Sequence, residues 1–339
     1  MRKRMLLLIA SLLMIGASFS FAGGQKEAAG ASKGQPVFAT VVKSIAFNWF
    51  KRMGTGIQEF GTKYDVKAFM QGPSQADSSQ QINIIQGLIA QHPAAIMNDP
   101  YGVEQQEAVQ KQAMDARIVV VTMEAADVKY ANCDVEAFDN KAYGVEMMKQ
   151  LAQRMGGKGK YIQFVGALSN DSHMTWVNAA EAYQKEHYPD MQLIGRFESK
   201  EDVNTAYKIT KDVLQSHPDL KGIEGSGATD VVGAGRAVQE AGLDGKIAVV
   251  GTSIPSYAGD LLKSGAISLA MAWDPAAQGY AANVVAYKVL KGEKITDGMD
   301  LGVPGYDHIT LVTNSNGVPV VYGSAWIEFT AANMSQYPF

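Results

Sequence analysis

Residues 37–97 carry a regular alternation of strand and helix patterns, and they read VFATVVKSIAFNWFKRMGTGIQEFGTKYDVKAFMQGPSQADSSQQINIIQGLIAQHPAAIM. The apolar, β-branched run at the start, 37–42, is typical of a strand that is buried on both faces of a sheet. A helix, a strand, a helix and a further strand are then predicted at 48–64, 66–70, 76–91 and 94–97. Such alternation predicts parallel sheets covered by helices.

The same alternation continues beyond this segment. Further strands are predicted at 118–122, 161–165, 193–197, 222–224 and 247–250. Helices are predicted at 103–116, 141–154, 176–187, 204–216 and 231–241. The sequence therefore predicts an α/β protein made of two Rossmann-like lobes, each with a parallel sheet, joined by a hinge.

The beginning of the chain has the layout of a secretory signal peptide. A basic cluster at 2–4 precedes an apolar run at 5–15, and small residues end the segment at Ala22. The apolar run is too short for a membrane-spanning helix, which needs about 20 apolar residues. We expect a signal peptide at 1–22, a flexible tether at 23–35, and a periplasmic or other extracytoplasmic protein.

The rest of the chain is long enough for two lobes that exchange segments. One series of strand and helix units ends near 138–140, a second crossing is expected at 273–275, and the Gly- and Pro-rich segment 295–319 fits a last crossing. We predict one lobe formed by 36–138 and 274–305 and another formed by 139–273 and 306–339.

Composition excludes several kinds of site. The net charge is −4 and no basic block follows the leader, so the chain lacks the charge pattern of a nucleic-acid-binding protein. Cys133 is the single cysteine, which rules out an intramolecular disulfide and a site of several thiolates. The histidines are dispersed without metal-ligand spacing, and the first strand has no dinucleotide fingerprint, so we expect no metal and no cofactor.

Short motifs along the chain resemble those of a known family. They are NWF at 48–50, VVTME at 120–124, FDN at 138–140, SHPDL at 216–220, GAGRAVQEAG at 233–242, VVGTS at 249–253 and KVLKGE at 288–293. In this order they resemble the type I periplasmic sugar-binding proteins typified by ribose-binding protein. The resemblance covers nearly the whole mature chain. It implies the type I periplasmic binding protein fold, a bound sugar-like ligand and delivery to an ABC transporter permease.

Within that family the chain is similar to the branch that binds autoinducer-2 and rhamnose. The similarity rests on Lys43 and on the segments GTSIP at 251–255, WD at 273–274, LGVPG at 301–305 and MSQYPF at 334–339. The polar positions of the branch differ here, however. Glu124 replaces an aspartate, Ser172-His173 replace an Asp-Gln pair, and Gly227 and Thr229 replace Pro and Ala. The ligand stays open among pentose, deoxyhexose, polyol and autoinducer-2-like furanose.

A sugar presents apolar faces and hydroxyl edges, so its site needs planar aromatic side chains together with carboxylates and other polar groups. Trp49, Phe50 and Trp273 are candidates for the faces, with core packing as the alternative for each. The candidates for the edges lie in strand-end loops: Lys43, Asn48, Glu124, Asp171, Ser172, His173, Gly227, Thr229, Asp230, Ser253 and Asp274.

Some of these edge residues have an ordinary structural alternative. Asp171 and Asp230 could instead cap the helices that they precede. His173 could be a surface histidine. Glu124 could be a structural ion-pair partner, although it follows the apolar run 118–121 and is therefore expected at the cleft.

The alternatives to a solute-binding protein are an enzyme, a transcription repressor and a signalling receptor. A carbohydrate-acting enzyme could use Glu124 and Asp274 as a carboxylate pair, but the sequence marks no nucleophile and no metal. A sugar-responsive repressor needs a DNA-binding domain where this chain has its leader. A receptor for chemotaxis or quorum sensing, read by a chemoreceptor or sensor, uses the same closed lobes. We therefore predict a monomeric, non-enzymatic solute-binding protein that closes on its ligand.

Overall fold

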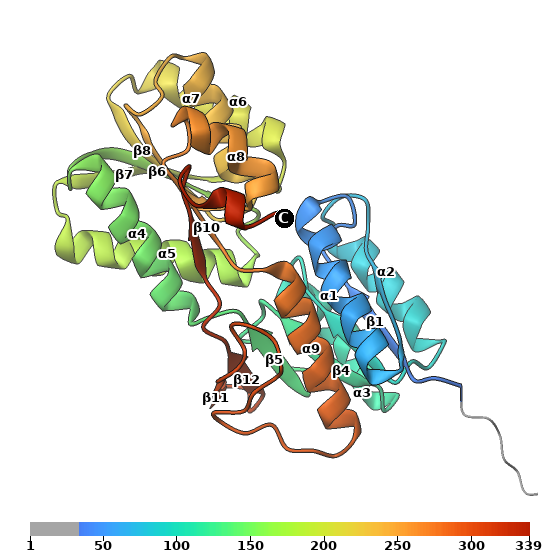
Figure 1. Cartoon of the computed structure of the whole chain (residues 1–339). Helices are drawn as coiled ribbons and strands as arrows, with labels where there is room; N and C mark the ends of the chain where they lie inside the picture. Colours follow the sequence, from blue (N-terminus) through green and yellow to red (C-terminus); the bar gives the residue numbers. More distant parts are fainter. Residues whose placement is uncertain (1–33) are drawn as a thin grey trace, which may run out of the picture. The chain divides into compact units, whose positions relative to one another are not determined.

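The computed structural model describes residues 34–339, so the predicted signal peptide and nearly all of the predicted tether lie outside the described part of the chain. Two sheets organise the described residues (Figure 1). One has seven strands in the order β11-β12-β5-β4-β3-β1-β2, and the other has six in the order β13-β10-β9-β8-β6-β7. We call each sheet with its helices a lobe, first and second in chain order.

The first lobe contains most of the chain up to residue 136 and two later segments. Its elements are β1 (Val37–Val41), α1 (Asn48–Tyr64), β2 (Lys67–Gln71), α2 (Ser78–Ile89), β3 (Ala95–Asn98), α3 (Val103–Asp115), β4 (Val119–Met123), β5 (Cys133–Glu136), α9 (Pro275–Leu290), β11 (Thr310–Thr313) and β12 (Pro319–Tyr322). All its strand pairs are parallel except the β11–β12 hairpin.

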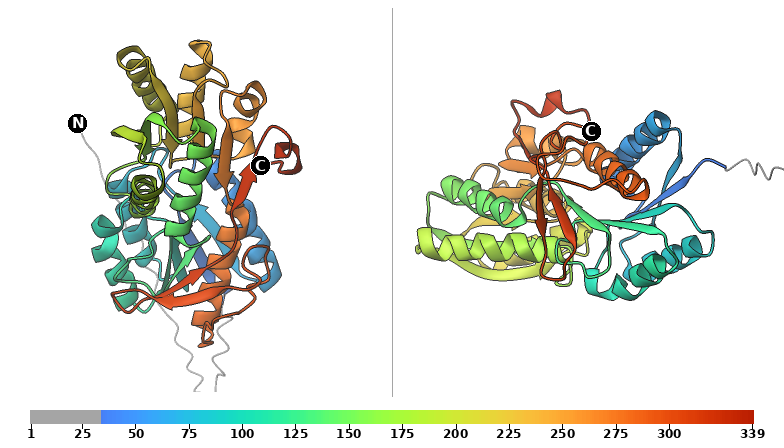
Figure 2. Two further views of the ribbon diagram at one scale, coloured as in Figure 1. Left: turned by 90° about the vertical axis from the view of Figure 1, so that its left-hand side faces the viewer. Right: turned by 90° about the horizontal axis from the view of Figure 1, so that it is seen from below.

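The second lobe follows the same plan. Its elements are α4 (Asn140–Met155), β6 (Gly159–Val165), α5 (Asp171–His187), β7 (Met191–Glu198), α6 (Val203–Ser216), β8 (Leu220–Gly225), α7 (Asp230–Glu240), β9 (Ala248–Thr252), α8 (Pro255–Ser264), β10 (Leu269–Ala272), β13 (Ile327–Phe329) and the 3-10 turn η1 (Met334–Gln336). Only β13 pairs antiparallel, with β10. The two parallel sheets with flanking helices agree with the predicted fold class, and Figure 2 shows helices on both faces of the sheets.

Helix α9 lies in the core of the first lobe. It is buried on all sides from Pro275 to Ala286, because it packs between α1 and strands β3, β4 and β5. Gly56 of α1 touches this helix so closely that a β-carbon there would lie 1.9 Å from the backbone oxygen of Ala276. This close approach brings the aromatic start of α1 beside the start of α9.

The last crossing between the lobes differs from our expectation. Residues 306–339 were expected in the second lobe, but β12 pairs with β5 of the first sheet, and only β13 reaches the second sheet. The chain therefore crosses between Tyr322 and Ile327, and the segment 295–309 stays on the first lobe. The physical reason is the apolar pattern of β12, whose buried Val320 and Val321 pack between β11 and β5 in the first sheet.

Among residues 34–339, no helix combines the length and the apolar character needed to cross a membrane.

Candidate functional site

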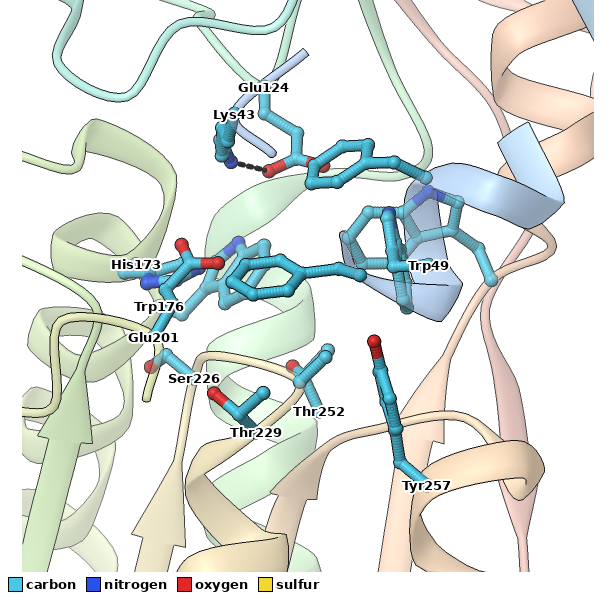
Figure 3. Close-up of a pocket in the computed structure, with 14 residues that line it drawn as sticks. Lys43, Trp49, Glu124, His173, Trp176, Glu201, Ser226, Thr229, Thr252 and Tyr257 are labelled. Atoms are coloured by element: carbon cyan, nitrogen blue, oxygen red, sulfur yellow. Dashed lines mark hydrogen bonds and ion pairs between the residues drawn. The ribbon is translucent and has the colours of Figure 1, made fainter. Parts of the chain in front are cut away.

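A pocket lies where loops from both lobes meet, beyond the carboxyl ends of their strands (Figure 3). In the first sheet the strand order reverses between β1 and β3, and in the second sheet it reverses between β6 and β8. Parallel sheets bind ligands at such switch points. The lining comprises Lys43, Phe47, Trp49, Phe50, Glu124, His173, Trp176, Glu201, Ser226, Ala228, Thr229, Thr252, Tyr257 and Trp273. It leaves about 30 Å³ for the centres of water-sized molecules.

The first lobe contributes a buried ion-pair cluster. Lys43 follows β1, Asp99 follows β3 and Glu124 follows β4, so three neighbouring strand ends bring these side chains together. Lys43 Nζ lies 2.6 Å from Glu124 Oε2 and 3.1 Å from Asp99 Oδ1. Burial alone would lower the pKa of Lys43, but the carboxylates of Asp99, Glu124 and Glu201 outweigh it and raise that pKa above its ordinary value. Lys43 is therefore a permanent cation.

The loop that carries Asp99 is held by a network of buried amides. Gln81 donates from Nε2 to the Asp99 carbonyl at 2.9 Å and accepts the Tyr101 N–H at 2.9 Å. Gln106 donates to Gln81 Oε1 at 2.7 Å and accepts from Asn98 Nδ2 at 2.9 Å. Burial raises the pKa of Asp99 well above its ordinary value, with Glu124 adding to this and Lys43 opposing it. The network fixes the acidic partner of Lys43 in place.

His173 enters the pocket as a neutral imidazole. Its Nδ1 accepts the backbone N–H of Gly166 at 3.0 Å, so the proton of the neutral ring lies on Nε2. Burial, assisted by the charge of Lys43, lowers the pKa of His173 well below its ordinary value. The residue therefore offers the pocket a hydrogen-bond donor without a positive charge.

The second lobe supplies polar atoms that have no partner within the described residues. Glu201 Oε1, Ser226 Oγ and Thr229 Oγ1 are buried, and residues 34–339 provide no hydrogen bond to any of them. Their side chains are 8%, 0% and 5% exposed. Unpaired buried polar groups are costly, so these atoms are positioned to bind something that enters the pocket.

Both pocket carboxylates sit on strained backbone. Glu124 has φ of 53° and Glu201 has φ of 52°, in the left-handed region that favours glycine. Residues with side chains pay about 1–3 kcal/mol for such conformations, which cluster at functional sites. The strain supports a role for both carboxylates in the pocket.

Aromatic rings form the remaining wall. Trp49 meets Trp273 edge to face, with ring centroids 4.6 Å apart, and Phe138 and Trp176 surround Trp273 at 5.1 and 6.1 Å. The Trp273 Nε1–H donates to Gln278 Oε1 at 2.7 Å, which fixes its ring. Phe47, Phe50 and Tyr257 complete the aromatic lining.

The lobes also contact each other beside the pocket. The Tyr257 hydroxyl of the second lobe accepts the backbone N–H of Asn48 in the first. Arg52 of α1 forms an ion pair with Asp274 and lies with its guanidinium 4.8 Å from the ring centroid of Phe339. The Phe339 carbonyl accepts the Ser256 N–H at 2.9 Å, which ties the end of the chain to α8.

The structure brings part of the predicted set into the pocket. The predicted residues in the lining are Lys43, Trp49, Phe50, Glu124, His173, Thr229 and Trp273. Those outside it are Asn48, Asp171, Ser172, Gly227, Asp230, Ser253 and Asp274.

Most of the outside residues use their polar groups inside the protein. Asp274 caps α9 through the Ala276 N–H at 2.9 Å and holds Arg52, while Ser253 donates to the Ala228 carbonyl at 2.8 Å. Ser172 donates to Asn170 Oδ1 at 3.0 Å. The Gly227 N–H donates to Asp230 Oδ2 at 2.7 Å, and burial raises the pKa of Asp230 to about 7.

Neither Asp171 nor Asp230 caps the helix that it was expected to precede. Helix α5 is capped by Asn170, which accepts the His173 N–H at 3.2 Å, and not by Asp171. The cap position of α7 is Thr229, without a side-chain cap, so Asp230 braces the preceding loop instead. Asp171 lines a separate surface hollow with Leu168 and Met174.

Sequence reasoning missed several lining residues: Phe47, Trp176, Glu201, Ser226, Ala228, Thr252 and Tyr257. Glu201 follows the predicted strand 193–197 by four residues, so its position beyond a strand end was a usable signal. Trp176 lies one helical turn beyond His173 and therefore shares its face. Tyr257 belongs to α8, a helix that the sequence pattern did not predict, and no signal pointed to it.

Comparisons with known proteins agree with this architecture. A family model described as a periplasmic binding protein domain matches residues 38–294. The "D-allose-binding periplasmic protein" of Escherichia coli K12 is 26% identical over 252 residues, covering 70% of this chain and 79% of the relative. The "D-ribose/D-allose-binding protein" of Pseudomonas aeruginosa is 24% identical over 272 residues, covering 76% and 83%.

Solved structures share the fold at low identity. LsrB from Clostridium saccharobutylicum, in complex with AI-2, superimposes with a TM-score of 0.83 at 20% identity, covering 89% of this chain and 100% of that one. An ABC transporter solute-binding protein from Clostridium phytofermentas with bound L-rhamnose gives 0.82 at 18% identity, covering 89% and 98%. With the family model spanning both lobes, the chain belongs to the periplasmic binding protein domain family.

Proposed function

We propose that this chain is the extracytoplasmic solute-binding protein of an ABC transporter and that it binds a small sugar or sugar-like molecule without turnover. The observation that carries the proposal is the pocket itself, in which strand-end loops of both lobes meet and the second lobe presents unpaired polar atoms beside aromatic rings. Aromatic faces suit the C–H faces of a sugar, and the polar atoms suit its hydroxyls. The names of the relatives, which refer to allose and ribose, support this class of ligand.

A thermal-shift screen tests the proposal. Pentoses, deoxyhexoses, hexoses, polyols and autoinducer-2 are added separately to the mature protein, and the melting temperature is recorded. A ligand at a hundredfold excess over its dissociation constant adds about 2.7 kcal/mol to the stability of the folded state. Product analysis after prolonged incubation accompanies each hit, because release of a modified sugar would contradict binding without turnover.

We expect the ligand to enter by separation of the lobes and to be held by their closure. The pocket leaves about 30 Å³, and a water needs about 10–15 Å³ on this measure, so only two or three waters have room. Rotation about the crossings at 138–140, 273–275 and 323–326 opens the pocket, and a ligand that contacts both lobes stabilises the closed form.

Small-angle X-ray scattering should therefore report a smaller radius of gyration at saturating ligand, with a scattering mass that matches a monomer. An unchanged radius in the presence of a ligand verified by calorimetry would argue against closure.

Glu124→Gln is expected to weaken ligand binding by roughly tenfold or more, because a charged acceptor contributes about 1.5–3 kcal/mol to a hydrogen bond. The melting temperature without ligand should fall only slightly. The glutamine carbonyl still accepts a hydrogen bond from Lys43, which also keeps Asp99. Calorimetric titration and thermal melting of the same variant measure both effects.

Asp171→Asn is the matched control for Glu124→Gln, since it removes a carboxylate that lies outside the lining. Its affinity should equal that of the unmodified protein. If Glu124→Gln lowers the melting temperature strongly while affinity is kept, Glu124 is a structural ion-pair partner and not a ligand-binding residue.

A further inference from the structure

The charges around the pocket do not balance. Lys43 is engaged by both Glu124 and Asp99, at 2.6 and 3.1 Å. His173 is neutral, as its accepted hydrogen bond and its lowered pKa indicate. Glu201 adds a further carboxylate, and it forms no ion pair with any residue of the described range 34–339. The lining thus contains two carboxyl groups, those of Glu124 and Glu201, and one cation, Lys43.

Glu201 is the carboxylate of the lining without an ion-pair contact among residues 34–339; burial raises its pKa, and the charge of Lys43 lowers it. It is 8% exposed, and its Oε1 has no hydrogen-bond partner among residues 34–339. The backbone N–H of Glu201 donates a hydrogen bond to Ser199 Oγ at 3.1 Å, which anchors the residue at the end of its loop. In Figure 3 its carboxylate lies beside His173 and opposite the Lys43–Glu124 pair. A hydrogen-bond donor on the ligand would satisfy this oxygen, and a charged donor would also favour the ionised form of the carboxylate.

We propose that the ligand carries a protonated amine, as in an amino sugar or amino polyol, and that Glu201 pairs with its ammonium group. This rests on the proposed function and narrows its ligand class. Closing the lobes over a neutral sugar would bury Glu124 and Glu201 with Lys43 as their only nearby cation in the lining. Like charges that share a site of low dielectric constant repel strongly, whereas an ammonium group converts the same site into a set of charge-assisted hydrogen bonds.

The aromatic wall suits the same ligand. Trp49, Phe50, Trp176, Tyr257 and Trp273 line the pocket together with the carboxylates. An ammonium group near the face of such rings is attracted by their quadrupoles. The unpaired Ser226 and Thr229 hydroxyls stay available for the hydroxyl groups of the ligand. Glu201 therefore recognises the charge, while the rings and hydroxyls recognise the carbon frame.

Matched ligand pairs test the proposal by isothermal titration calorimetry at pH 7. They are glucosamine and glucose, galactosamine and galactose, mannosamine and mannose, and glucamine and sorbitol, with the N-acetylated amino sugars as larger neutral derivatives. In at least one pair the amine should bind at least tenfold tighter than its neutral partner, and the N-acetylated form should lose this gain.

Glu201→Gln should reduce that amine affinity at least tenfold more than it reduces the affinity of the neutral partner. Glu198→Gln is the matched control, because Glu198 is an exposed acidic residue on the same lobe outside the lining. It should change neither affinity appreciably. The comparison of ligand pairs on the unmodified protein decides the question even if Glu201→Gln folds poorly.

Two other outcomes overturn the proposal and separate it from the proposed function. If neutral sugars bind as tightly as their amines in every pair, the ligand class proposed here is wrong while sugar binding stands. If no sugar, polyol or amine in the panel binds, both the ligand class and the proposed function fail.

Discussion

Lys43→Met is expected to lower the free energy of unfolding of the unliganded protein by about 3–5 kcal/mol, the usual cost of removing one partner from a buried ion pair. The lysine side chain is only 4% exposed and serves two carboxylates, Asp99 and Glu124. Methionine has a similar volume, so the loss reflects charge and not a cavity. Urea denaturation followed by circular dichroism measures it.

The pH dependence of the loss identifies its cause. Burial already holds the pKa of Asp99 above its ordinary value, and without Lys43 that pKa rises further. A carboxyl group whose pKa is raised in the folded state destabilises the fold above that pKa, and the cost disappears as the pH falls below it. The difference between Lys43→Met and the unmodified protein should therefore shrink from pH 7 toward pH 5.

Lys111→Met is the control for Lys43→Met, since Lys111 pairs with Asp115 on the exposed face of α3. It should change the unfolding midpoint little, because exposed ion pairs are screened by water and salt. An equally small effect of Lys43→Met, or a difference that does not vary with pH, would mean that the cluster is solvated and does not act as a buried ion pair.

The fold was largely predictable because buried parallel strands leave a strong pattern. Segments such as 118–122, with five consecutive β-branched residues, read as strands without any tertiary information. The last crossing was not predictable in the same way. Strand β12 is only four residues long, and its partner β5 is far away in the sequence. Composition marks the whole segment 295–319 as a crossing, although β11 lies within it, and it does not say which sheet the following strand joins.

The site was predictable at the level of loops and much less at the level of side chains. Strand-end position predicted that Lys43 and Glu124 lie together, because the parallel strands of one sheet end at the same edge, and it selected His173 at the corresponding edge of the other lobe. It could not separate residues that face the pocket from residues that face the protein. Asp274 looked equally suitable, yet it caps α9 and binds Arg52. The direction of the Glu201 side chain depends on a left-handed backbone conformation that no local sequence pattern predicts.

Trp273→Ala is expected to lower the free energy of unfolding by about 3–5 kcal/mol, the usual cost of deleting a large buried aromatic side chain. The indole is 2% exposed and touches rings from both lobes, Trp49 on one side and Trp176 on the other. Its removal also leaves Gln278 Oε1 without its 2.7 Å donor. Ligand affinity should fall as well, because the ring lines the pocket at a crossing between the lobes.

Trp326→Ala separates burial from the mere loss of a tryptophan. Trp326 lies in the same aromatic group, with its centroid 5.7 Å from Phe138 and 6.0 Å from Tyr143, but it is 37% exposed and lies outside the pocket lining. Its loss should cost clearly less stability, since water can fill the space that the indole leaves, and ligand affinity should be kept. Chemical denaturation and calorimetric titration of both variants measure these differences. Equal losses of stability in the two variants would show that the burial of Trp273 does not determine its contribution to the free energy of unfolding. Unchanged ligand affinity in Trp273→Ala would mean that this ring does not contact the ligand, which leaves Trp49 and Tyr257 as the candidate aromatic contacts.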